Sequence, residues 1–317
     1  MSDTAISFVM PIKNAAPFIG DALSWIATPE IIELGKSIEV ILVDDGSSDN
    51  LNAALEDIMD PVGIIKYVKH PGSGKVSALN YGYSLSRGRC IKFIDADDVL
   101  ECAWFSLTEA WKHGGNGRWA EVHGARIVDK QLKPIAVYRP PSFEKRDEAF
   151  KNLASVPRWS WCVSRGLCDK ILPFPAELPF EDVWMAAATV RWAQSIRVIA
   201  SPVYLYRQHG YQTFGGAFNF ARNMVTFRCR RMEKVISCMI SHAGRFDMNE
   251  AEASRVLRQQ ADYWRRLQDY DAGTLSVLRS RLPTRLKMKI LLQQRTPRLC
   301  GCVVHMKWFW DGLRNYV

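Results

Sequence analysis

The sequence contains no run of about 18 consecutive apolar residues, the length that a membrane-spanning helix requires. Its first residues, Met1–Thr4, lack the basic start and the long apolar segment of a secretory signal peptide. No CxxC spacing is repeated in the way that would suit a zinc site. We therefore expect a cytoplasmic protein with reduced thiols, whose only contact with a membrane is peripheral. The eight cysteines are Cys90, Cys102, Cys162, Cys168, Cys229, Cys238, Cys300 and Cys302.

Two common nucleotide-binding signatures are also missing. No GxGxxG motif follows the first apolar segment, so a dinucleotide-binding fold has little support. Gly72–Lys75 resembles the end of a phosphate-binding Walker loop. However, Lys69 stands where that motif needs its first glycine, and Val76 stands where it needs Ser or Thr. Any nucleotide must therefore be held by another kind of site.

Charge is distributed unevenly along a chain of otherwise ordinary composition. The 317 residues are 48% hydrophobic and 24% charged, as in folded globular proteins, and the length allows one large domain with an appendage. From Phe218 onward the chain has 19 Lys and Arg against 8 Asp and Glu, a net charge of +11, whereas the first 217 residues carry −2. The basic character therefore belongs to the C-terminal part.

The first half alternates short β-branched runs with segments of helical periodicity. Such repeated βα units predict a mostly parallel sheet covered by helices on both faces, with ligands bound at the carboxyl edge of the strands. The expected strands are Ile6–Met10, Ile38–Val43, Val62–Val68 and Cys90–Ile94, and the expected helices cover residues 17–27, 49–58 and 74–86.

Further along, the pattern becomes mixed and then almost wholly helical. Strands are expected at Glu121–Val128, Trp159–Ser164 and Ile196–Tyr206, with a helix over Glu181–Gln194. Gly215–Gly216 precedes the helical part, so we place a boundary there. The expected organisation is an α/β domain over residues 1–214, divided near residue 118, and a basic helical C-terminal region over residues 215–317.

Carboxylates gather where two of these strands end. Asp44 and Asp45 follow one strand, and Asp95 and Asp97 follow another, so a parallel sheet would bring both clusters to one edge. Clustered carboxylates repel one another unless a cation joins them, and oxygen ligands favour Mg²⁺ or Mn²⁺. Because Mg²⁺ commonly completes its coordination with substrate phosphates, a diphosphate is the expected ligand.

Two acids that follow these clusters, Asp49 and Asp98, can also be explained as helix caps. Asp98 with Glu101 resembles a capping box that opens a helix over Val99–Trp111, and Asp49 suits the cap of a helix over Leu51–Ile58. Capping does not account for the four acids that precede these positions. For those four we favour the functional interpretation.

Four ordered motifs carry a resemblance to a known family. They are Val9–Asn14 (VMPIKN), Val43–Asp49 (VDDGSSD), Gly74–Gly82 (GKVSALNYG) and Gly88–Asp98 (GRCIKFIDADD). Their order over about 90 residues is far more specific than a lone DxD. The chain resembles the family 2 glycosyltransferases. This resemblance implies the GT-A fold, a Rossmann-like and mostly parallel sheet flanked by helices, with a nucleotide-sugar half over about residues 1–118 and an acceptor half over about residues 119–214.

The resemblance also implies roles for residues at matching positions. A nucleotide sugar, with a UDP-sugar favoured, would be bound by Pro11, Asp44, Asp45, Lys75 and Asp95. Mn²⁺ or Mg²⁺ would be held by Asp97, Asp95 and His209. The last of these closes a Tyr-Arg-x-His segment, Tyr206–His209, whose Arg207 is a candidate partner for phosphate. Gly46 and Gly82 fit a tight turn or a close backbone approach, or are ordinary loop glycines.

A sugar hydroxyl is a poor nucleophile until a base removes its proton. Glu181–Asp182 resembles the family's ED motif at the start of a helix, which implies that Asp182 is the base and that Glu181 positions the acceptor. Without the resemblance, acids in a first helical turn simply complement the helix dipole. The implied reaction is one displacement at the anomeric carbon, which inverts its configuration.

Three classes of function follow, in descending order of support. The first is an inverting, metal-dependent hexosyl- or N-acetylhexosaminyltransferase that acts on a glycan or lipid-linked acceptor in surface polysaccharide or glycolipid synthesis. The second, a sugar nucleotidyltransferase, would share the sheet and the metal-binding acids. The third, a nonenzymatic nucleic-acid binder, would use the basic tail, although no known nucleic-acid-binding module is present.

The basic C-terminal region has two interpretations. Arg255–Tyr270 and Leu286–Gln293 are amphipathic, and Val303–Trp310 mixes aromatic and basic residues. These features suit reversible docking on an anionic membrane surface. They equally suit a helical bundle that packs on the catalytic domain or across a dimer and exposes a solvated basic face.

Overall fold

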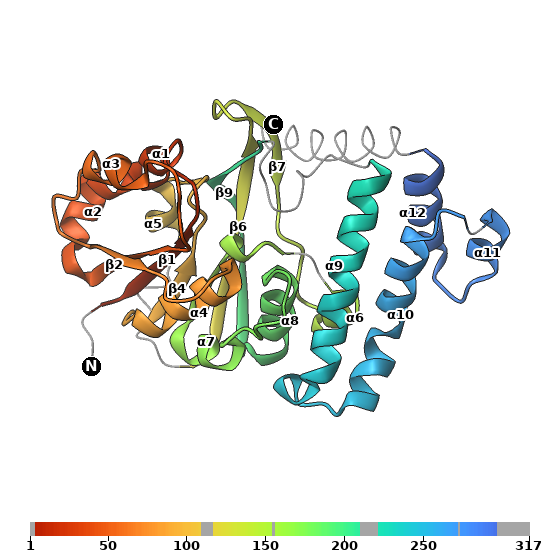
Figure 1. The fold of residues 1–317 in the computed structure, drawn as a ribbon. Coiled ribbons are helices and arrows are strands. Elements are labelled where there is room, and N and C mark those ends of the chain that lie inside the picture. Colours follow the sequence, from red (N-terminus) through yellow and green to blue (C-terminus); the bar gives the residue numbers. More distant parts are fainter. Residues whose placement is uncertain (1–3, 109–116, 154–155, 210–220, 272, 297–317) are drawn as a thin grey trace.

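The computed structural model describes residues 4–108, 117–153, 156–209, 221–271 and 273–296 (Figure 1). Among these residues, nine strands form one sheet in the order β3-β2-β1-β4-β8-β6-β9-β5, with β7 paired to β6. The strands are β1 (Ile6–Ile12), β2 (Ile38–Asp44), β3 (Ile65–Lys69), β4 (Cys90–Phe93), β5 (Val99–Leu100), β6 (Trp119–Val128), β7 (Pro134–Tyr138), β8 (Trp161–Ser164) and β9 (Ser195–Arg207).

The sheet is parallel in its first half and mixed in its second. Strands β3, β2, β1 and β4 are all parallel neighbours, as the βα pattern predicts. Strand β8 then runs antiparallel to both β4 and β6, β6 is parallel to β9, and β9 is antiparallel to β5. The α/β fold class, with a parallel first half of the sheet, is thereby confirmed.

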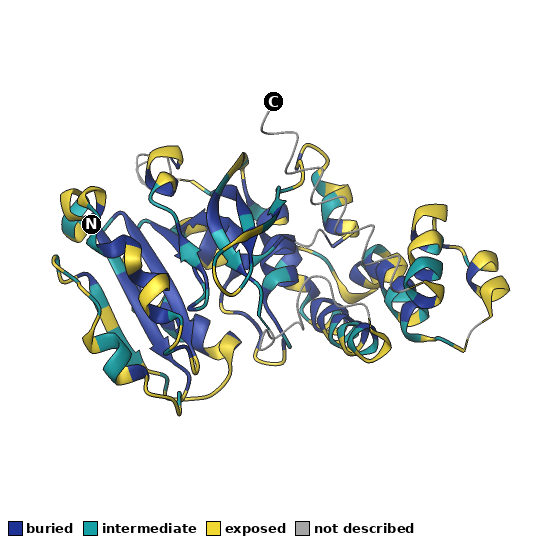
Figure 2. Ribbon diagram, turned by 90° about the horizontal axis from the view of Figure 1, so that it is seen from above, coloured by how far each residue is buried: buried dark blue, intermediate teal, exposed yellow. Residues whose placement is uncertain are grey.

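Helices cover both faces of this sheet. In the first 209 residues they are α1 (Ile19–Leu23), η1 (Ser24–Ala27), α2 (Pro29–Leu34), η2 (Gly35–Ser37), α3 (Leu51–Glu56), α4 (Lys75–Leu85), α5 (Ala103–Leu107), α6 (Arg146–Lys151), η3 (Arg158–Ser160), α7 (Arg165–Ile171) and α8 (Asp182–Trp192). Because successive strand residues point to opposite faces, Val9 packs in the cluster of α4, α7 and α8, whereas Phe8 and Met10 pack in the cluster of α1, η1 and α5. Figure 2 shows the strands as the buried centre of the molecule.

Gly46 and Gly82 have the backbone roles that tight turns and close packing require. Gly46 has φ of +78°, a left-handed conformation that suits glycine, in the turn after β2. On α4, a Cβ at Gly82 would lie 2.5 Å from Val9 Cγ1 and 2.9 Å from Val43 Cγ2. Helix α4 therefore packs directly against β1 and β2, which fixes the position of its N-terminus.

The helix expected over Val99–Trp111 begins later than predicted, and residues 109–111 of that range lie outside the described residues. Residues 99–100 form β5, which pairs with β9, and a helix begins only at Ala103. Asp98 therefore caps no helix, and its Oδ1 instead accepts the backbone N–H of Arg207 at 2.7 Å. Tertiary pairing with β9 outweighs the local helical pattern here.

The expected cap at Asp49 is also wrong. The side-chain Oδ2 of Asp49 accepts the backbone N–H of Ala16 at 2.8 Å, and α3 begins after Asn50 without a side-chain cap. Asp49 thus ties the loop after β2 to the loop after β1. The two loops lie side by side at the carboxyl edge of the sheet.

Among the described residues, the C-terminal region consists of five helices, of which the first three pack on the sheet domain and the last two pack on their neighbours within the region. They are α9 (Arg222–Ser241), η4 (Ala243–Phe246), α10 (Glu250–Gln268), α11 (Thr274–Arg279) and α12 (Thr284–Arg295). Met232 and Val235 of α9 and Leu257 of α10 belong to the same apolar cluster as the residues of α4, α7 and α8. Figure 1 shows α9 lying between α8 and α10. Packing on the catalytic domain is thus observed for residues 221–268, while membrane docking stays a prediction and Val303–Trp310 lies outside the described residues.

Two further expectations concern cysteines and membrane spans. Six cysteines, Cys90, Cys102, Cys162, Cys168, Cys229 and Cys238, are free thiols in the structure. Cys300 and Cys302 lie outside the described residues. Within the part of the chain that the structure describes, no helix is both long enough and apolar enough to cross a bilayer.

Candidate active site

A cleft of about 1090 Å³ opens at the carboxyl edge of the parallel strands. Its walls come from the loop after β1, the start of α4, the segment after β4, the loop before α8 and the end of β9. It therefore lies where the order of the strands predicts ligand binding. Eight residues singled out from the sequence line it: Pro11, Asp45, Lys75, Asp95, Asp97, Glu181, Asp182 and His209.

Asp44, the remaining candidate, does not line this cleft. Its carboxylate accepts the backbone N–H of Ser47 and the hydroxyl of Tyr67, both at 2.8 Å, and so holds the turn after β2. Burial raises the pKa of Asp44, but these hydrogen bonds outweigh burial and keep that pKa below its usual value. Asp44 is thus charged and holds the turn after β2, and its carboxylate does not face the cleft.

Asp45 lies at the cleft wall beside the start of α4. Its Oδ1 accepts the backbone N–H of Gly74 at 2.7 Å and lies 3.0 Å from Nδ1 of His70. Lys13 approaches the other carboxylate oxygen at 3.9 Å. The carboxylate thus connects the loop after β2 to the loop that leads into α4, and both loops border the same part of the cleft.

Asp95 is surrounded by cations. Lys75 Nζ lies 2.9 Å from its Oδ1, and the Arg158 guanidinium donates to the same oxygen. Burial raises the pKa of Asp95, but the charges of Arg158 and Lys75 outweigh burial and lower the pKa to about 2. Since its negative charge is already neutralised, Asp95 is a poorer metal ligand than the sequence motif suggests.

Asp97 and His209 form a second pair in the cleft. His209 Nε2 lies 2.9 Å from Asp97 Oδ2, and 31% of the Asp97 side chain is exposed. The imidazole stacks on Phe18, with ring centroids 5.0 Å apart, which orients the nitrogen toward the carboxylate. One carboxylate oxygen and one imidazole nitrogen suit a divalent cation that takes its remaining ligands from water and a diphosphate. The donor set therefore fits the expected metal.

Arg158, which no sequence motif singles out, links the segment after β4 to the start of α8. Its side chain is 1% exposed. Besides the contact with Asp95, its Nε donates to Glu181 Oε1 at 2.7 Å, and its backbone N–H donates to Asp182 Oδ1 at 2.7 Å. The only local signal is a charged residue that begins the buried turn η3 just before β8, and a buried charge is uncommon without a partner.

Glu181 and Asp182 stand at the N-terminus of α8, as expected from the sequence. Glu181 is buried, and Asp182 is the first residue of the helix. Burial and the charge of Glu181 raise the pKa of Asp182, while Lys75 and Arg158 lower it, with a net rise to about 6. A carboxylate with this pKa is largely ionised at neutral pH and takes up a proton more readily than an exposed Asp, as a general base must.

Arg207 has a structural position that its motif does not predict. Its Nε donates to the backbone carbonyl of Asp97 at 2.8 Å, and its Nη2 donates to Asp21 at 2.8 Å. The residue is buried and is absent from the lining of the cleft. Arg207 therefore holds the Asp97 segment from behind, and phosphate pairing has no support for it.

Aromatic and basic groups complete the wall of the cleft near α8. Trp159 stacks on Tyr204, with ring centroids 4.8 Å apart, and Trp159 and Tyr206 both line the cleft. Arg231 of α9 also lines it, with its guanidinium over the ring of Phe180 and bonded to the carbonyl of Pro179. The C-terminal region thus contributes a side chain to the site, which no local pattern indicates.

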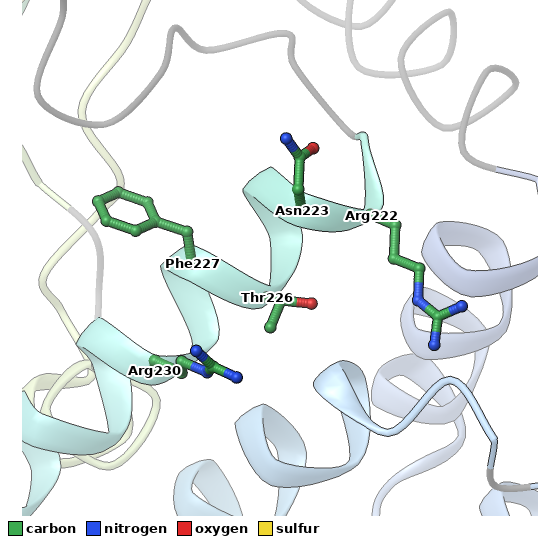
Figure 3. A pocket seen from close by; sticks show the side chains of 5 residues that line it. All are labelled: Arg222, Asn223, Thr226, Phe227 and Arg230. Carbon is green, nitrogen blue, oxygen red and sulfur yellow. The ribbon is translucent and has the colours of Figure 1, made fainter.

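A second hollow lies on α9 away from the acids. It is lined by Arg222, Asn223, Thr226, Phe227 and Arg230, which project from one helix, as Figure 3 shows. Two guanidinium groups and one ring offer binding contacts, but none of these five side chains is an acid or a base suited to proton transfer near neutral pH. The first cleft is therefore the candidate active site.

The chain resembles known glycosyltransferases in sequence. It is 29% identical over 224 residues to the uncharacterized glycosyltransferase EpsJ of Bacillus subtilis (strain 168), a match that covers 64% of this chain and 61% of EpsJ. It is 30% identical over 97 residues to glycosyltransferase GlyG of Streptococcus pneumoniae serotype 4, over 30% of this chain and 31% of GlyG. The chain thus spans less than two thirds of the length of these relatives.

Solved structures share the fold at low sequence identity. The S. aureus TarS fragment 1–349 in complex with UDP-GlcNAc has a TM-score of 0.54 and 15% identity, over 91% of this chain and 80% of that one. The mannosyltransferase PcManGT from Pyrobaculum calidifontis, in complex with GDP-Man and Mn²⁺, has a TM-score of 0.50 and 15% identity, over 96% and 87%. The model of the family "Glycosyl transferase family 2" matches residues 7–171, just over half of the chain. The chain belongs to glycosyl transferase family 2.

Proposed function

We propose that this glycosyltransferase moves a hexosyl or N-acetylhexosaminyl group from a nucleotide-diphosphate sugar, with a UDP-sugar favoured, to a hydroxyl of a glycan or lipid-linked acceptor. One observation carries the proposal. A single cleft contains, on one side, a carboxylate and an imidazole that suit a divalent cation, Asp97 and His209, and, on the other side, a carboxylate with a raised pKa, Asp182. Displacement at a sugar carbon needs both groups.

The donor is assigned to the part of the cleft between the loop after β1 and the start of α4. Pro11, Asp45 and Lys75 line this part, and Asp95 holds the Lys75 ammonium in place. Asp45 replaces Asp44 as the carboxylate that faces the nucleoside, for the reason given above. The UDP-GlcNAc complex of TarS and the GDP-Man complex of PcManGT support a nucleotide sugar as the ligand class.

The divalent cation, Mn²⁺ or Mg²⁺, is assigned to Asp97 and His209. When bound, it neutralises the charge that develops on the departing diphosphate. Asp95 supplies negative charge nearby, but Lys75 and Arg158 already occupy its carboxylate. Lys75 is thereby placed to offer a second positive charge to the phosphates.

Asp182 is assigned as the base for the acceptor hydroxyl. It takes the hydroxyl proton as the oxygen forms a bond to the anomeric carbon, while the bond from that carbon to the diphosphate oxygen breaks on the opposite face. One such displacement inverts the configuration. Glu181 positions the acceptor, and Arg158 fixes Glu181 and Asp182 relative to Asp95.

The acceptor side is assigned to the wall formed by Trp159, Tyr206, Phe180 and Arg231. Aromatic rings suit stacking against sugar rings, and Arg231 adds a positive charge from α9. A lipid-linked acceptor in polysaccharide or glycolipid synthesis would place the protein in the cytoplasm, peripherally at the inner face of the membrane. Flotation of the full chain with anionic liposomes at low salt tests this part, and indifference to the anionic lipid contradicts it.

The test of the reaction uses nucleotide sugars as stabilising ligands. One UDP- or GDP-sugar should raise the unfolding temperature of the full chain more in the presence of Mn²⁺ than in its absence. Incubation of that donor with an acceptor library should then release the nucleoside diphosphate and form a glycoside. If the product is instead a sugar nucleotide made from a sugar phosphate and a nucleoside triphosphate, the nucleotidyltransferase alternative is correct.

A further inference from the structure

Three side chains with metal-ligand chemistry meet outside the active-site cleft. Cys238 and His242 lie one helical turn apart at the end of α9, and Glu177 lies in the loop between α7 and α8. His242 Nδ1 is 3.4 Å from Glu177 Oε1 and 3.8 Å from Cys238 Sγ. The three ligand atoms all lie within 4.8 Å of one another. They come from two segments that are about 60 residues apart in sequence, so helix packing on the sheet domain creates the cluster.

We propose that Glu177, Cys238 and His242 form a transition-metal site, with Zn²⁺ as the ion that fits best. Zinc binds Cys sulfur at about 2.3 Å and His nitrogen or carboxylate oxygen at about 2.0–2.1 Å, in tetrahedral geometry. These lengths place the sulfur and the nitrogen about 3.6 Å apart, and the nitrogen and the oxygen about 3.3 Å apart. The observed separations of 3.8 and 3.4 Å need only small side-chain shifts.

The chemistry of the ligands separates this site from the one in the cleft. A thiolate selects zinc and similar soft or borderline ions, whereas the carboxylate-rich cleft suits Mg²⁺ and Mn²⁺. Cys238 is 4% exposed, while the side chains of His242 and Glu177 are 37% and 55% exposed. The thiolate would therefore bind from the protein side, and water would reach the fourth position from the solvent side.

Metal binding would replace weaker contacts that the same groups make without an ion. His242 Nδ1 lies 3.1 Å from the backbone carbonyl of Cys238 and 3.2 Å from Ser241 Oγ. A metal at Nδ1 requires the tautomer with its proton on Nε2, and the thiol must lose its proton. On binding, His242 Nδ1 would give up its contact with the Cys238 carbonyl and bind the cation. A cation in the last turn of α9 is favoured because the C-terminus is the negative end of the helix dipole.

An ion bound at Glu177 would also affect the cleft, because Glu177 lies in a loop that forms part of the cleft wall. Its neighbours Ala176 and Leu178–Phe180 line the cleft, and the same loop continues into Glu181 and Asp182. Arg231 of α9 already holds this loop through the carbonyl of Pro179. An ion at Glu177 would add a second link from α9, so that the loop is held at two points. The site would thus stabilise the acceptor wall without touching the substrate.

Co²⁺ tests the proposal because it substitutes for zinc and reports thiolate ligation by its absorption. The full chain is stripped with a chelator and titrated with Co²⁺ and no other ion. We expect a thiolate-to-cobalt charge-transfer band in the near ultraviolet, which one equivalent of Zn²⁺ removes. The cleft site contributes no such band, since Asp97 and His209 offer no sulfur. Absence of the band from the wild-type chain overturns the proposal.

A matched pair of variants identifies the sulfur. Cys238→Ser should lose the band, whereas Cys229→Ser, a buried cysteine on the same helix, should keep it. His242→Gln and Glu177→Gln should each weaken Zn²⁺ binding at least tenfold, and they keep the test valid if Cys238→Ser does not fold. A band that persists in Cys238→Ser assigns the thiolate elsewhere and refutes the site. Protection by nucleotide sugar with Mn²⁺ is measured separately, so its failure would count against the proposed reaction and leave the zinc site intact.

Discussion

The raised pKa of Asp182 makes a prediction that two opposite substitutions can test. Asp182 has a pKa of about 6, raised by burial and by Glu181 and lowered by Lys75 and Arg158. If Asp182 is the base, kcat/KM should be half-maximal near pH 6 and should fall about tenfold per pH unit below it. Replacing one charged neighbour should move this midpoint in the direction set by the sign of the charge removed.

Glu181→Gln removes a negative charge beside Asp182, so its midpoint should shift to lower pH. Lys75→Met removes a positive charge, so its midpoint should shift to higher pH. A single charge at this range typically moves a buried carboxyl by about one pH unit or more, which places the two midpoints near 5 and 7. Both variants should lose activity, but the midpoint of a pH profile is independent of its height.

The assay follows release of the nucleoside diphosphate across about pH 4.5 to 8.5. Each profile is repeated at two saturating Mn²⁺ concentrations, because a midpoint that reflects competition between protons and the metal would move with metal concentration, whereas the midpoint of Asp182 would not. Shifts of the two variants in the same direction, or midpoints that follow the metal concentration, would refute Asp182 as the group that titrates.

Three further predictions concern single residues. Asp182→Asn should abolish transfer and keep protection by the donor. It should also raise the free energy of unfolding at pH 7 by up to about 3 kcal/mol, because the folded-state pKa of Asp182 exceeds the usual 3.8 and its ionisation destabilises the fold as pH rises through 4 to 6. A lower denaturant midpoint for the variant contradicts this. Asp97→Asn should remove the Mn²⁺-dependent part of donor protection while the metal-free unfolding temperature stays unchanged, and unaltered metal dependence would count against the assignment. Gly82→Ala should destabilise the fold by about 1 to 3 kcal/mol in chemical denaturation, because its methyl group meets Val9 and Val43; a stability equal to that of the wild type would show that α4 can move away from the sheet.

Most of the strands and the position of the cleft could be predicted because their signals are local. Apolar runs such as residues 38–43 are buried whatever they pair with, and the acids that follow them share one edge once the strands are parallel. Asp182 was singled out through the resemblance of Glu181–Asp182 to a family motif, because acids at the start of a helix otherwise only complement the helix dipole. In each case a short stretch of sequence contains both the element and its functional residue.

The remaining features depend on contacts between distant segments. Val99–Leu100 forms a strand because β9 lies beside it. Asp98 accepts a hydrogen bond from the backbone N–H of Arg207, which lies 109 positions later in the sequence. Arg158 joins the site because β8 is inserted beside β4, an arrangement that the sequence pattern does not specify. The partners of a charged residue decide its role, and partners are set by topology.

The shared apolar cluster of α9, α10 and the sheet domain restricts how this chain can be divided. Met232 and Val235 of α9 and Leu257 of α10 belong to the apolar cluster that also contains residues of α8, so removal of everything after residue 214 would expose part of this cluster to water. Exchange of the tail between relatives would therefore succeed only if the inward-facing residues of α9 were transplanted with their counterparts on α8. Substitutions in the C-terminal region would then be tolerated only on its outward-facing side chains. A change there could alter what this region recognises without unfolding the protein.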